Sequence, residues 1–480
     1  MTSVVAATES IEAKRMRLRE MLGQTAGWKL YPLSFPQQRL WFLAQLRPGS
    51  AAYNCPGAIR LKGSLDVPAL RASLSEVVRR HEVFRTTFHI IAQEPVQVVG
   101  PASEVPLPIV DVSGARDAER LAGAVADEQA QRPFDLSRGP LLRALLLRLS
   151  DEEHLMLLIV HHITGDAWSF GILIQEVTTL YVARLEGRAS ALPELRLQYG
   201  DFARWQRGRL KDQTFVEHLA YWRRQLKDLP PLVLSTRPRR TRRGGRCGER
   251  RWFQFAPDLS SALKSLSNES NATLFMTLMA GFQALLYRYT GQPDFAIGSP
   301  IANRRHAETE RLIGFFVNML VLRAHLSGNP TFRCLLARVR ETCLEAYAHQ
   351  DVPFEKIVEE LAPERSGDNT PLLDVVLALE SAPREIINLP GLATGRAALP
   401  HGYSRFDLHV LLVDMPDGLE VTFEYDRELF AAPEIDLLVQ RFERLLTAVV
   451  ENPDLRLLDI PLTVTAMDNL TLVHADQFDF

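Results

Sequence analysis

The sequence predicts an α/β fold built from two lobes of similar size. Short apolar runs typical of strands alternate with amphipathic helical patterns through both halves of the chain. The length of 480 residues exceeds what one typical hydrophobic core supports. A segment near the middle is rich in Arg, Gly and Pro and has no apolar periodicity, which indicates a solvated connector between the lobes.

In the first half, the apolar periodicity predicts a helical extension over 8–23, with Gly23 as its stop signal, ahead of the first lobe. The expected helices of the lobe are 37–46, 67–81, 118–131 and 172–186, and its expected strands are 58–61, 96–99, 141–149 and 155–160.

The second half repeats this alternation without a literal sequence repeat. The expected helices are 259–266, 274–289, 331–349 and 432–451, and the expected strands are 252–255, 294–297, 315–322 and 372–379. A Met-Pro-Asp turn joins two further strands, 408–414 and 418–425, as a hairpin.

These patterns divide the chain into an N-terminal helical extension (1–27), an N-terminal lobe (28–233), an Arg-rich connector (234–251), a C-terminal lobe (252–465) and a C-terminal tail (466–480). Eight arginines between Arg237 and Arg251 could attract an acidic protein surface or a phosphate group. A solvated linker with no dedicated ligand explains the same composition.

Composition narrows the functional class. The net charge of −3 gives no basic signature of nucleic-acid binding, and no apolar run approaches the roughly 20 residues of a membrane span. The N-terminus has no apolar core of a signal peptide. The four cysteines, Cys55, Cys247, Cys334 and Cys343, form no Cys-x-x-Cys pair. This argues against a zinc site and favours a reducing, cytoplasmic compartment.

Two adjacent histidines are the strongest candidates for chemistry. His161 and His162 follow the buried strand over 155–160, and Asp166 lies four residues after the second histidine. A histidine at the end of a strand can present a neutral imidazole to a substrate. Asp166 can fold back to hold the loop or pair with a cation from elsewhere. The pattern favours an active-site loop over a metal site, and two hydrogen-bonded structural histidines are the alternative.

The chain resembles the condensation domain of nonribosomal peptide synthetases over roughly residues 30–465. Seven blocks carry the resemblance in the order that this family has them, and together they are far more specific than the double histidine alone. They are Leu33-Ser-Phe-Pro-Gln-Gln-Arg-Leu-Trp-Phe-Leu43, Arg80-His-Glu-Val-Phe-Arg-Thr-Thr-Phe88, residues 161–169, Tyr199-Gly-Asp-Phe-Ala-Arg-Trp-Gln-Arg207, Ile297-Gly-Ser-Pro-Ile-Ala-Asn-Arg304 with Ile313-Gly-Phe-Phe-Val-Asn-Met-Leu320, His349-Gln-Asp-Val-Pro-Phe-Glu-Lys356 and, more loosely, Asn369-Thr-Pro-Leu-Leu373.

The resemblance implies two chloramphenicol-acetyltransferase-like lobes that form a V-shaped pseudo-dimer around a central tunnel. Donor and acceptor carrier proteins, loaded by adenylation domains, would bring an acyl or peptidyl thioester and an amine on phosphopantetheine arms. The amine would attack the thioester carbonyl, with no covalent acyl-enzyme and no cofactor or metal bound by the chain itself. A monomer is expected, with no nucleic-acid or membrane partner.

The resemblance also implies a role for each site residue. His162 is the expected catalytic residue, and it would accept the proton of the amine or hydrogen-bond the tetrahedral intermediate. His161, Asp166 and Arg304 would support the loop, with Asp166 and Arg304 as an ion pair. The residues expected along the substrate and pantetheine channel are Ala167, Trp168, Ser169 and Asn318.

The order of residues in the third block bears on the subtype. Trp168 precedes Ser169, unlike in epimerisation domains, and both histidines are kept, unlike in heterocyclisation domains. The opening blocks look like those of domains that take an L-configured, starter or polyketide-derived donor. Ala167 stands where the family usually has Gly. If the backbone there passes near the pantetheine arm, the added methyl group would narrow the donor channel or shift the loop. If φ is negative at this site, Ala would be tolerated.

Three alternatives remain open from the sequence. The acceptor could be an alcohol, which would give an ester. The chain could be a non-catalytic platform that binds carriers and recruits a tailoring enzyme, although such members usually lose the second histidine. A coenzyme A-dependent acyltransferase would share the His-x-x-x-Asp arrangement but not the other blocks. The tail after residue 462 favours a free-standing enzyme over an excised domain.

Overall fold

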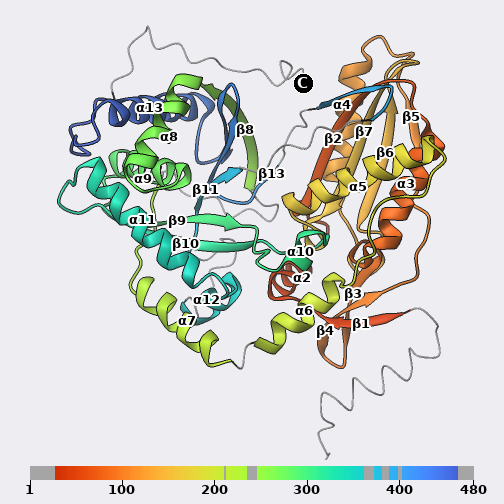
Figure 1. Cartoon of the computed structure of the whole chain (residues 1–480), viewed down its shortest axis with the longest axis horizontal. Helices are drawn as coiled ribbons and strands as arrows, with labels where there is room; N and C mark the ends of the chain where they lie inside the picture. Colours follow the sequence, from red (N-terminus) through yellow and green to blue (C-terminus); the bar gives the residue numbers. More distant parts are fainter. Residues whose placement is uncertain are drawn as a thin grey trace, which may run out of the picture.

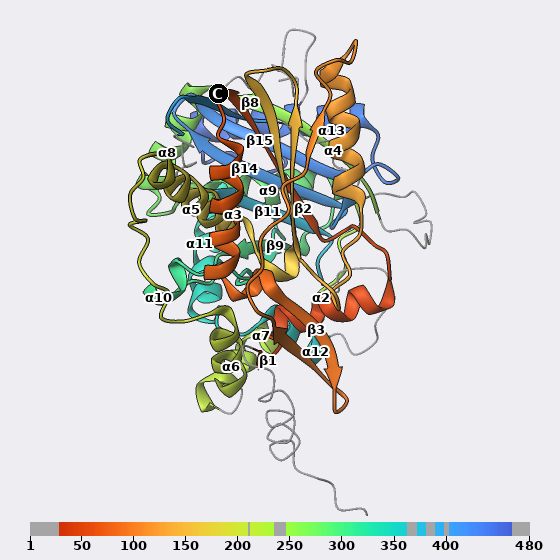
Figure 2. The same ribbon diagram turned by 90° about the vertical axis from the view of Figure 1, so that its right-hand side faces the viewer.

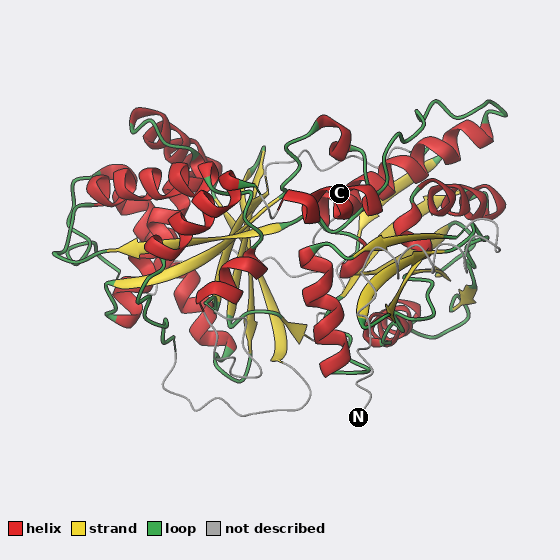
Figure 3. Ribbon diagram, turned by 90° about the horizontal axis from the view of Figure 1, so that it is seen from below, coloured by secondary structure: helices red, strands yellow, loops and turns green. Residues whose placement is uncertain are grey.

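The protein consists of two α/β lobes that lie side by side (Figures 1 and 3). This computed structural model describes residues 28–209, 212–234, 246–361, 372–380, 389–397 and 403–462. The predicted two-lobe α/β organisation is confirmed. The predicted helix over 8–23, the extension 1–27 and the tail 466–480 lie outside the described residues.

The N-terminal lobe is built on a five-stranded sheet with strand order β12-β2-β7-β6-β5. The pairs are antiparallel except for β5 and β6. The strands are β2 (Asn54–Gly63), β5 (Ile109–Asp111), β6 (Leu142–Arg148), β7 (Glu153–His161) and β12 (Leu392–Arg396). β7 is buried along almost its whole length, as its apolar run predicts.

Helices cover both faces of this sheet. α3 (Val67–Arg80) and α5 (Ala167–Leu185) pack with the larger core on one face, and α4 (Ala118–Gln131) packs with a smaller core on the other. α3 begins where the Asp66 side chain accepts a hydrogen bond from the backbone N–H of Ala69, as a helix N-cap does. The lobe is therefore a three-layer sandwich with its double histidine at one end of a central strand.

A small antiparallel sheet closes the lower end of the N-terminal lobe (Figure 2). It contains β1 (Lys29–Pro32), β3 (Thr86–Ile91) and β4 (Glu94–Val99), and the short turn η1 (Glu82–Arg85) precedes β3. α2 (Phe35–Leu46) and α6 (Tyr199–Gly208) lie beside it. Gly200 permits this packing because a Cβ atom there would overlap the ring of Tyr31.

The C-terminal lobe has a seven-stranded sheet with order β10-β9-β11-β14-β15-β8-β13. Its strands are β8 (Arg246–Phe255), β9 (Asp294–Ile301), β10 (Asn318–His325), β11 (Val375–Glu380), β13 (Tyr403–Ser404), β14 (Leu408–Met415) and β15 (Gly418–Asp426). The predicted hairpin is β14–β15, which pairs from Leu408 and Tyr425 to Met415 and Gly418.

Four long helices bury one continuous core against this sheet: α8 (Pro257–Glu269), α9 (Leu274–Thr290), α11 (Phe332–Ala348) and α13 (Ala432–Glu451). α9 ends at Gly291, whose φ of 72° is the left-handed conformation that glycine adopts readily. α7 (Gln213–Gln225) packs against the core of this lobe although the sequence assigned it to the N-terminal lobe, and α12 (Phe354–Leu361) lies beside it. The short helix α10 (Ala307–Glu310) lies between the lobes (Figure 1).

Three sequence expectations about boundaries were wrong. β8 begins at Arg246, so the last residues of the predicted connector belong to a strand. Arginines can occupy this strand because their charges are paired: Arg250 forms an ion pair with Glu424, and Arg251 forms one with Asp436. The strand expected over 315–322 runs instead over Asn318–His325, and residues 312–317 form an irregular segment.

The predicted division between the lobes was also wrong at one strand, β12. β12 comes from the second half of the chain but pairs with β2 in the N-terminal sheet, from Leu392 opposite Gly63 to Arg396 opposite Ile59. In Figure 1 it is the short blue strand on the right-hand lobe, far in sequence from its neighbours. The C-terminal half therefore contributes to both lobes.

No helix within the described ranges is long and apolar enough to cross a membrane.

Candidate active site

The double histidine lies where β7 gives way to a loop, as the sequence predicts. His161 is the last residue of β7, and His162 begins the 3-10 turn η2 (His162–Thr164). Asp166 is the N-cap of α5. The loop is therefore fixed at both ends by regular secondary structure. It is anchored further by a hydrogen bond of 2.8 Å from the backbone N–H of His162 to the Tyr53 carbonyl oxygen.

His161 is buried and points into the protein. Its Nδ1 accepts a hydrogen bond of 3.1 Å from the backbone N–H of Ile163, which closes the turn after β7. Burial, together with the neighbouring charges of His162 and Arg405, lowers the pKa of His161 to about 3. The imidazole is neutral at physiological pH and holds the loop through a backbone hydrogen bond.

His162 is half-buried, and its ring is oriented by two contacts. Its Nδ1 lies 2.7 Å from the Gly165 carbonyl oxygen, which can only accept, so Nδ1 carries the proton and donates it. The ring centroid lies 4.5 Å from that of Phe315. With Nδ1 occupied in this way, Nε2 presents the lone pair that a general base requires.

Asp166 is buried, and its carboxylate holds the loop through hydrogen bonds on both oxygens. Its Oδ1 caps α5 by accepting from the backbone N–H of Ser169 at 2.8 Å, and Arg304 Nη2 lies 3.3 Å from the same oxygen. Its Oδ2 accepts from the backbone N–H groups of Phe316 and Val317 at 3.0 and 3.3 Å. The predicted pair with Arg304 is present, and the backbone hydrogen bonds to 316 and 317 are an addition that the sequence did not indicate.

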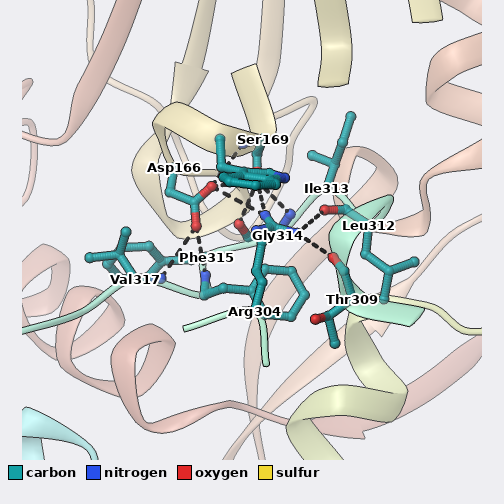
Figure 4. Close-up of polar contacts among 12 residues, drawn as sticks. Asp166, Ser169, Arg304, Thr309, Leu312, Ile313, Gly314, Phe315 and Val317 are labelled. Carbon is teal, nitrogen blue, oxygen red and sulfur yellow. Dashed lines mark hydrogen bonds and ion pairs between the residues drawn. The ribbon is translucent and has the colours of Figure 1, made fainter. Parts of the chain in front are cut away.

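Arg304 connects this carboxylate to the second half of the chain (Figure 4). Its guanidinium donates to the carbonyl oxygens of Thr309 and Leu312, to Ser169 Oγ at 2.9 Å and to Asp166, and it lies 4.1 Å from the ring centroid of Phe316. Burial lowers the pKa of Arg304, and Asp166 partly offsets that effect. A charge buried to this degree is retained because both Nη atoms meet acceptors and the guanidinium lies against an aromatic ring, although Nε has no hydrogen-bond partner among the described residues.

Residues 312–317, which we call the bridging segment, lie across the loop and belong to the core of the N-terminal lobe. Besides Asp166, three further N-terminal side chains hold its backbone. His81 Nδ1 accepts from Ile313 N–H at 3.4 Å, Ser169 Oγ accepts from Gly314 N–H at 3.1 Å, and Tyr199 donates to the Phe315 carbonyl oxygen at 2.6 Å. The sequence marked this stretch only as part of the fifth block. No local pattern reveals these partners, because they come from three distant elements.

Two of the residues expected along the channel are buried and hydrogen-bonded within the protein. Ser169 is buried, and its hydroxyl contacts Asp166, Arg304 and the backbone of Gly314. Asn318 is buried as well; its amide donates to the carbonyl oxygens of Gln350 and Val352 and accepts from Phe354 N–H, which anchors the start of α12. Their polar atoms are occupied by protein contacts, so both residues act as structural anchors, and their place along the channel stays a prediction.

Ala167 and Trp168 are exposed at the start of α5, close to His162 in sequence. Ala167 is the first residue of α5, and its φ is not positive. The methyl group of Ala therefore causes no backbone strain at this position. The interpretation in which Ala is tolerated at negative φ is therefore confirmed, and a donor channel narrowed by this methyl group stays a prediction. Trp168 donates from Nε1 to the Glu310 carbonyl oxygen at 3.0 Å.

Cys55 and Arg405 complete the surroundings of His162, and sequence reasoning missed both. Cys55 lies on β2 opposite Val160, and Arg405 from the C-terminal lobe donates to its Sγ at 3.4 Å. Burial alone would raise the pKa of the Cys55 thiol, but the charges and hydrogen bonds of His162 and Arg405 outweigh it and lower this pKa to about 6.

Next to this group lies a cavity of about 110 Å³ between the lobes. Asn54 and Pro56 line it from the N-terminal lobe, and Arg405, His409 and Glu424 line it from the C-terminal lobe. β2, which pairs with β7 next to the double histidine, therefore meets the second lobe at a hollow that neither lobe forms by itself. The site orients an imidazole beside a thiol, next to this hollow.

Comparison with known proteins places this geometry in a family. The family model described as the condensation domain matches residues 28–470. The chain is 44% identical over 452 residues to a linear gramicidin synthase protein of Brevibacillus parabrevis, an alignment that covers 93% of this chain and 9% of that protein. It is 40% identical over 455 residues to phosphinothricin tripeptide synthetase PhsC of Streptomyces viridochromogenes, covering 93% of this chain and 42% of the relative. The chain thus spans only part of the length of these relatives.

Solved structures give the same fold. The X-domain from teicoplanin biosynthesis superposes with a TM-score of 0.82 at 30% identity, covering 90% of this chain and 97% of that one. The first condensation domain of the calcium-dependent antibiotic synthetase, in complex with a substrate analogue, superposes with a TM-score of 0.75 at 22% identity over 93% of this chain and 99% of that one. These matches confirm the predicted two-lobe acetyltransferase-like fold. The match over residues 28–470 shows the family, and the double-histidine loop with its Asp166–Arg304 support agrees with it. The chain belongs to the condensation-domain family.

Proposed function

We propose that the protein joins a carrier-bound acyl or peptidyl thioester to an acceptor amine, forming an amide in nonribosomal peptide biosynthesis. The observation that carries this proposal is the orientation of His162, whose Nδ1 donates to the Gly165 carbonyl oxygen and so leaves Nε2 as the basic nitrogen. The family supplies the general acyltransferase-type role, and the choice of an amine acceptor is our inference.

In this mechanism the acceptor nitrogen forms a bond to the thioester carbonyl carbon, and the phosphopantetheine thiol leaves. His162 Nε2 either takes the proton of the attacking amine or hydrogen-bonds the tetrahedral intermediate. His161, Asp166 and Arg304 keep the imidazole in place without touching the reacting atoms. Ala167 and Trp168, exposed at the end of the same loop, are the residues we place along the pantetheine arm.

We further propose that donor and acceptor carrier proteins deliver both substrates, with phosphopantetheine belonging to the carriers and no cofactor bound by the chain itself. Adenylation domains would load these carriers, in the same chain or as separate proteins. A reducing, cytoplasmic setting fits the four cysteines, which remain thiols in the described part of the chain.

The test is condensation between an acyl-loaded and an aminoacyl-loaded carrier protein in vitro. His162→Ala is expected to lower kcat by about 10² to 10⁴ fold, the usual contribution of a positioned general acid–base group. His325→Ala is the matched control because His325 is exposed at the end of β10. Equal rates for the wild type and His162→Ala would refute the catalytic assignment.

The same assay separates catalysis from structural support. Asp166→Asn is expected to lower activity together with the free energy of unfolding, because the change leaves the buried Arg304 charge without its partner. His162→Ala is expected to lower activity with a much smaller effect on stability, since the ring is only half-buried and carries none of the buried charge that Asp166 shares with Arg304.

Two alternatives are distinguished by the acceptor and the product. A hydroxyacyl-loaded carrier in place of the aminoacyl one tests ester formation, and mild alkali cleaves an ester but not an amide. The platform alternative draws on the X-domain of teicoplanin biosynthesis, which has been solved in complex with OxyB. A platform would bind loaded carriers without forming either product, whereas the oriented imidazole of His162 favours turnover.

A further inference from the structure

A buried histidine of the second block, His81, forms a pair with a carboxylate that the proposed mechanism does not use. His81 follows directly on α3 and is 1% exposed, and Glu176 lies on α5 and is 5% exposed. Nε2 of His81 lies 3.0 Å from Oε2 of Glu176. Arg80 donates to both oxygens of the same carboxylate, at 3.1 and 3.2 Å. The buried charges of Arg80 and Glu176 are therefore paired, and the histidine shares their carboxylate.

The carboxylate of Glu176 fixes which nitrogen of His81 carries the proton. Burial alone would raise the pKa of Glu176, but the hydrogen bonds and charges of His81 and Arg80 outweigh it and lower this pKa below its usual range. An ionised carboxylate only accepts, so Nε2 carries the proton. The other ring nitrogen, Nδ1, then offers its lone pair to the backbone N–H of Ile313 at 3.4 Å. Both partners of the ring require the same tautomer.

This tautomer bears on the active site because Ile313 belongs to the bridging segment. Two residues further along the segment, Phe315 packs on the ring of His162, with 4.5 Å between the centroids. The next residue, Phe316, donates from its backbone N–H to Asp166 at 3.0 Å. A shift of Ile313 would therefore move groups that orient the catalytic loop, where displacements of about 1 Å lower rates strongly.

α5 holds the bridging segment at two points. Oγ of Ser169 accepts directly from the backbone N–H of Gly314, and Glu176 acts on the neighbouring residue through His81. Ser169 and Glu176 are seven residues apart, or about two turns, so they lie on one face of the helix. The helix that Asp166 caps is therefore fastened to the bridging segment both at its start and two turns later.

We propose that Glu176 and His81 are positioning residues for the condensation reaction. Glu176 holds His81 in the tautomer whose Nδ1 accepts from the bridging segment, and this contact keeps Phe315 against His162. Neither residue touches the substrates. The proposal rests on the proposed function for its kinetic measurements, whereas the tautomer of His81 is measured independently of any activity.

Two substitutions of His81 separate the two ends of the ring. In His81→Asn, Oδ1 takes the place of Nδ1 and can accept from Ile313, but the side chain no longer reaches Glu176. In His81→Gln, Nε2 of the amide can donate to Glu176, but no acceptor faces Ile313. In the carrier-based assay, His81→Gln is expected to lower kcat by about 10 to 10² fold without changing KM, and His81→Asn to retain most of the wild-type kcat.

A role in packing alone predicts the opposite order, because Gln is nearer to His in size than Asn is. Equal rates for the two variants, or a lower rate for His81→Asn, would overturn the positioning role. His154 provides the matched control, since it is a buried histidine of the same lobe at the far end of β7 from His161. His154→Asn and His154→Gln are expected to keep the wild-type kcat, and losses equal to those at His81 would contradict a specific role for His81.

Nitrogen NMR of the full chain with isotope-labelled histidine measures the tautomers directly. The spectra of His81→Asn and His162→Ala assign the two rings. In the wild type we expect the proton of His81 on Nε2 and that of His162 on Nδ1. Glu176→Gln is expected to admit the other tautomer of His81 and to lower kcat at unchanged KM, because an amide can donate as well as accept. A wild-type His81 protonated on Nδ1 would overturn the proposal even where Glu176→Gln fails to fold.

The two proposals fail separately. A wild type that forms amide, with His81→Gln and Glu176→Gln at the wild-type rate, would overturn the positioning role and leave the proposed function intact. A wild type that forms no amide would overturn the proposed function. The positioning of His162 would then be decided by its ring nitrogen signals, which are expected to shift in His81→Gln and to stay in place in His154→Gln.

Discussion

At the scale of single residues, the carboxylate of Asp166 organises the site. It accepts from the backbone of Ser169, Phe316 and Val317, from the Ser169 hydroxyl and from Arg304. Hydrogen bonds to an ionised acceptor are stronger than neutral ones, which allows one side chain to hold several segments together. The sequence predicted its pairing with Arg304. The backbone donors were unpredictable because they depend on how a distant segment folds over the loop.

His161 gives a prediction about pH at this scale. Its pKa is about 3 in the folded protein and about 6.5 when unfolded, so below pH 6.5 the unfolded chain binds a proton that the native chain does not. The free energy of unfolding should therefore fall by about 1.4 kcal/mol for each pH unit between these values. Denaturant titrations of the wild type and His161→Asn at about pH 7 and about pH 5 measure this contribution.

Comparing the wild type with His161→Asn separates the pH dependence due to His161 from that of the other titrating groups. The Asn side chain can offer an oxygen to Ile163 N–H in place of Nδ1 but takes up no proton. The variant is expected to lose about 2 kcal/mol less than the wild type over that pH range. An identical loss in both would contradict the neutral, buried state of His161.

At the scale of elements, the bridging segment decides how the loop is supported. It has no regular secondary structure, yet its backbone is held by side chains from α5, α6 and the residue that follows α3. Gly314 makes the approach possible because a Cβ atom there would overlap the ring of Tyr199. The prediction of a strand over 315–322 was wrong at its start because an apolar run of this length fits a strand and an irregular core segment equally well.

Gly314→Ala is expected to displace the bridging segment and to lower the free energy of unfolding by about 1–3 kcal/mol, as overpacking in a core does. Condensation activity should fall as well, since Phe315 packs on the ring of His162. Chemical denaturation and the carrier-based condensation assay measure the two effects.

Gly171→Ala provides the matched control on α5, because a Cβ atom there meets no neighbour within 4 Å. This substitution is expected to keep activity and to leave stability unchanged or raise it by up to about 1 kcal/mol, because Ala favours helices over Gly. Comparable losses in both variants would contradict a specific role for the close contact at Gly314.

At the scale of the whole molecule, the two lobes are not independent folding units. The core of the N-terminal lobe includes Leu312, Ile313, Phe315 and Phe316 from the bridging segment, and β12 extends its sheet. The Arg304–Asp166 pair and the Arg405–Cys55 contact also join residues from the two halves. The site exists only where both halves of the chain meet.

Phe316→Ala tests this coupling. Phe316 is fully buried, so its truncation is expected to cost about 3–5 kcal/mol. Because the residue belongs to the C-terminal half in sequence and the N-terminal lobe in space, calorimetry should show one unfolding transition at a lower temperature. Two resolved transitions, of which only one shifts, would contradict the shared core.

By itself the sequence determined the two-lobe α/β class, most of the long helices and buried strands, and the position of His161 and His162 at a strand end. The family resemblance carried by the ordered blocks added the Asp166–Arg304 pair. These depend on local periodicity or on a block order that the chain displays directly. Only the tertiary structure decided that Ser169 and Asn318 are anchors, that β12 crosses to the other lobe, and that Cys55 faces both His162 and Arg405. Each of these depends on residues far apart in the chain, and periodicity carries no information about contacts of that kind.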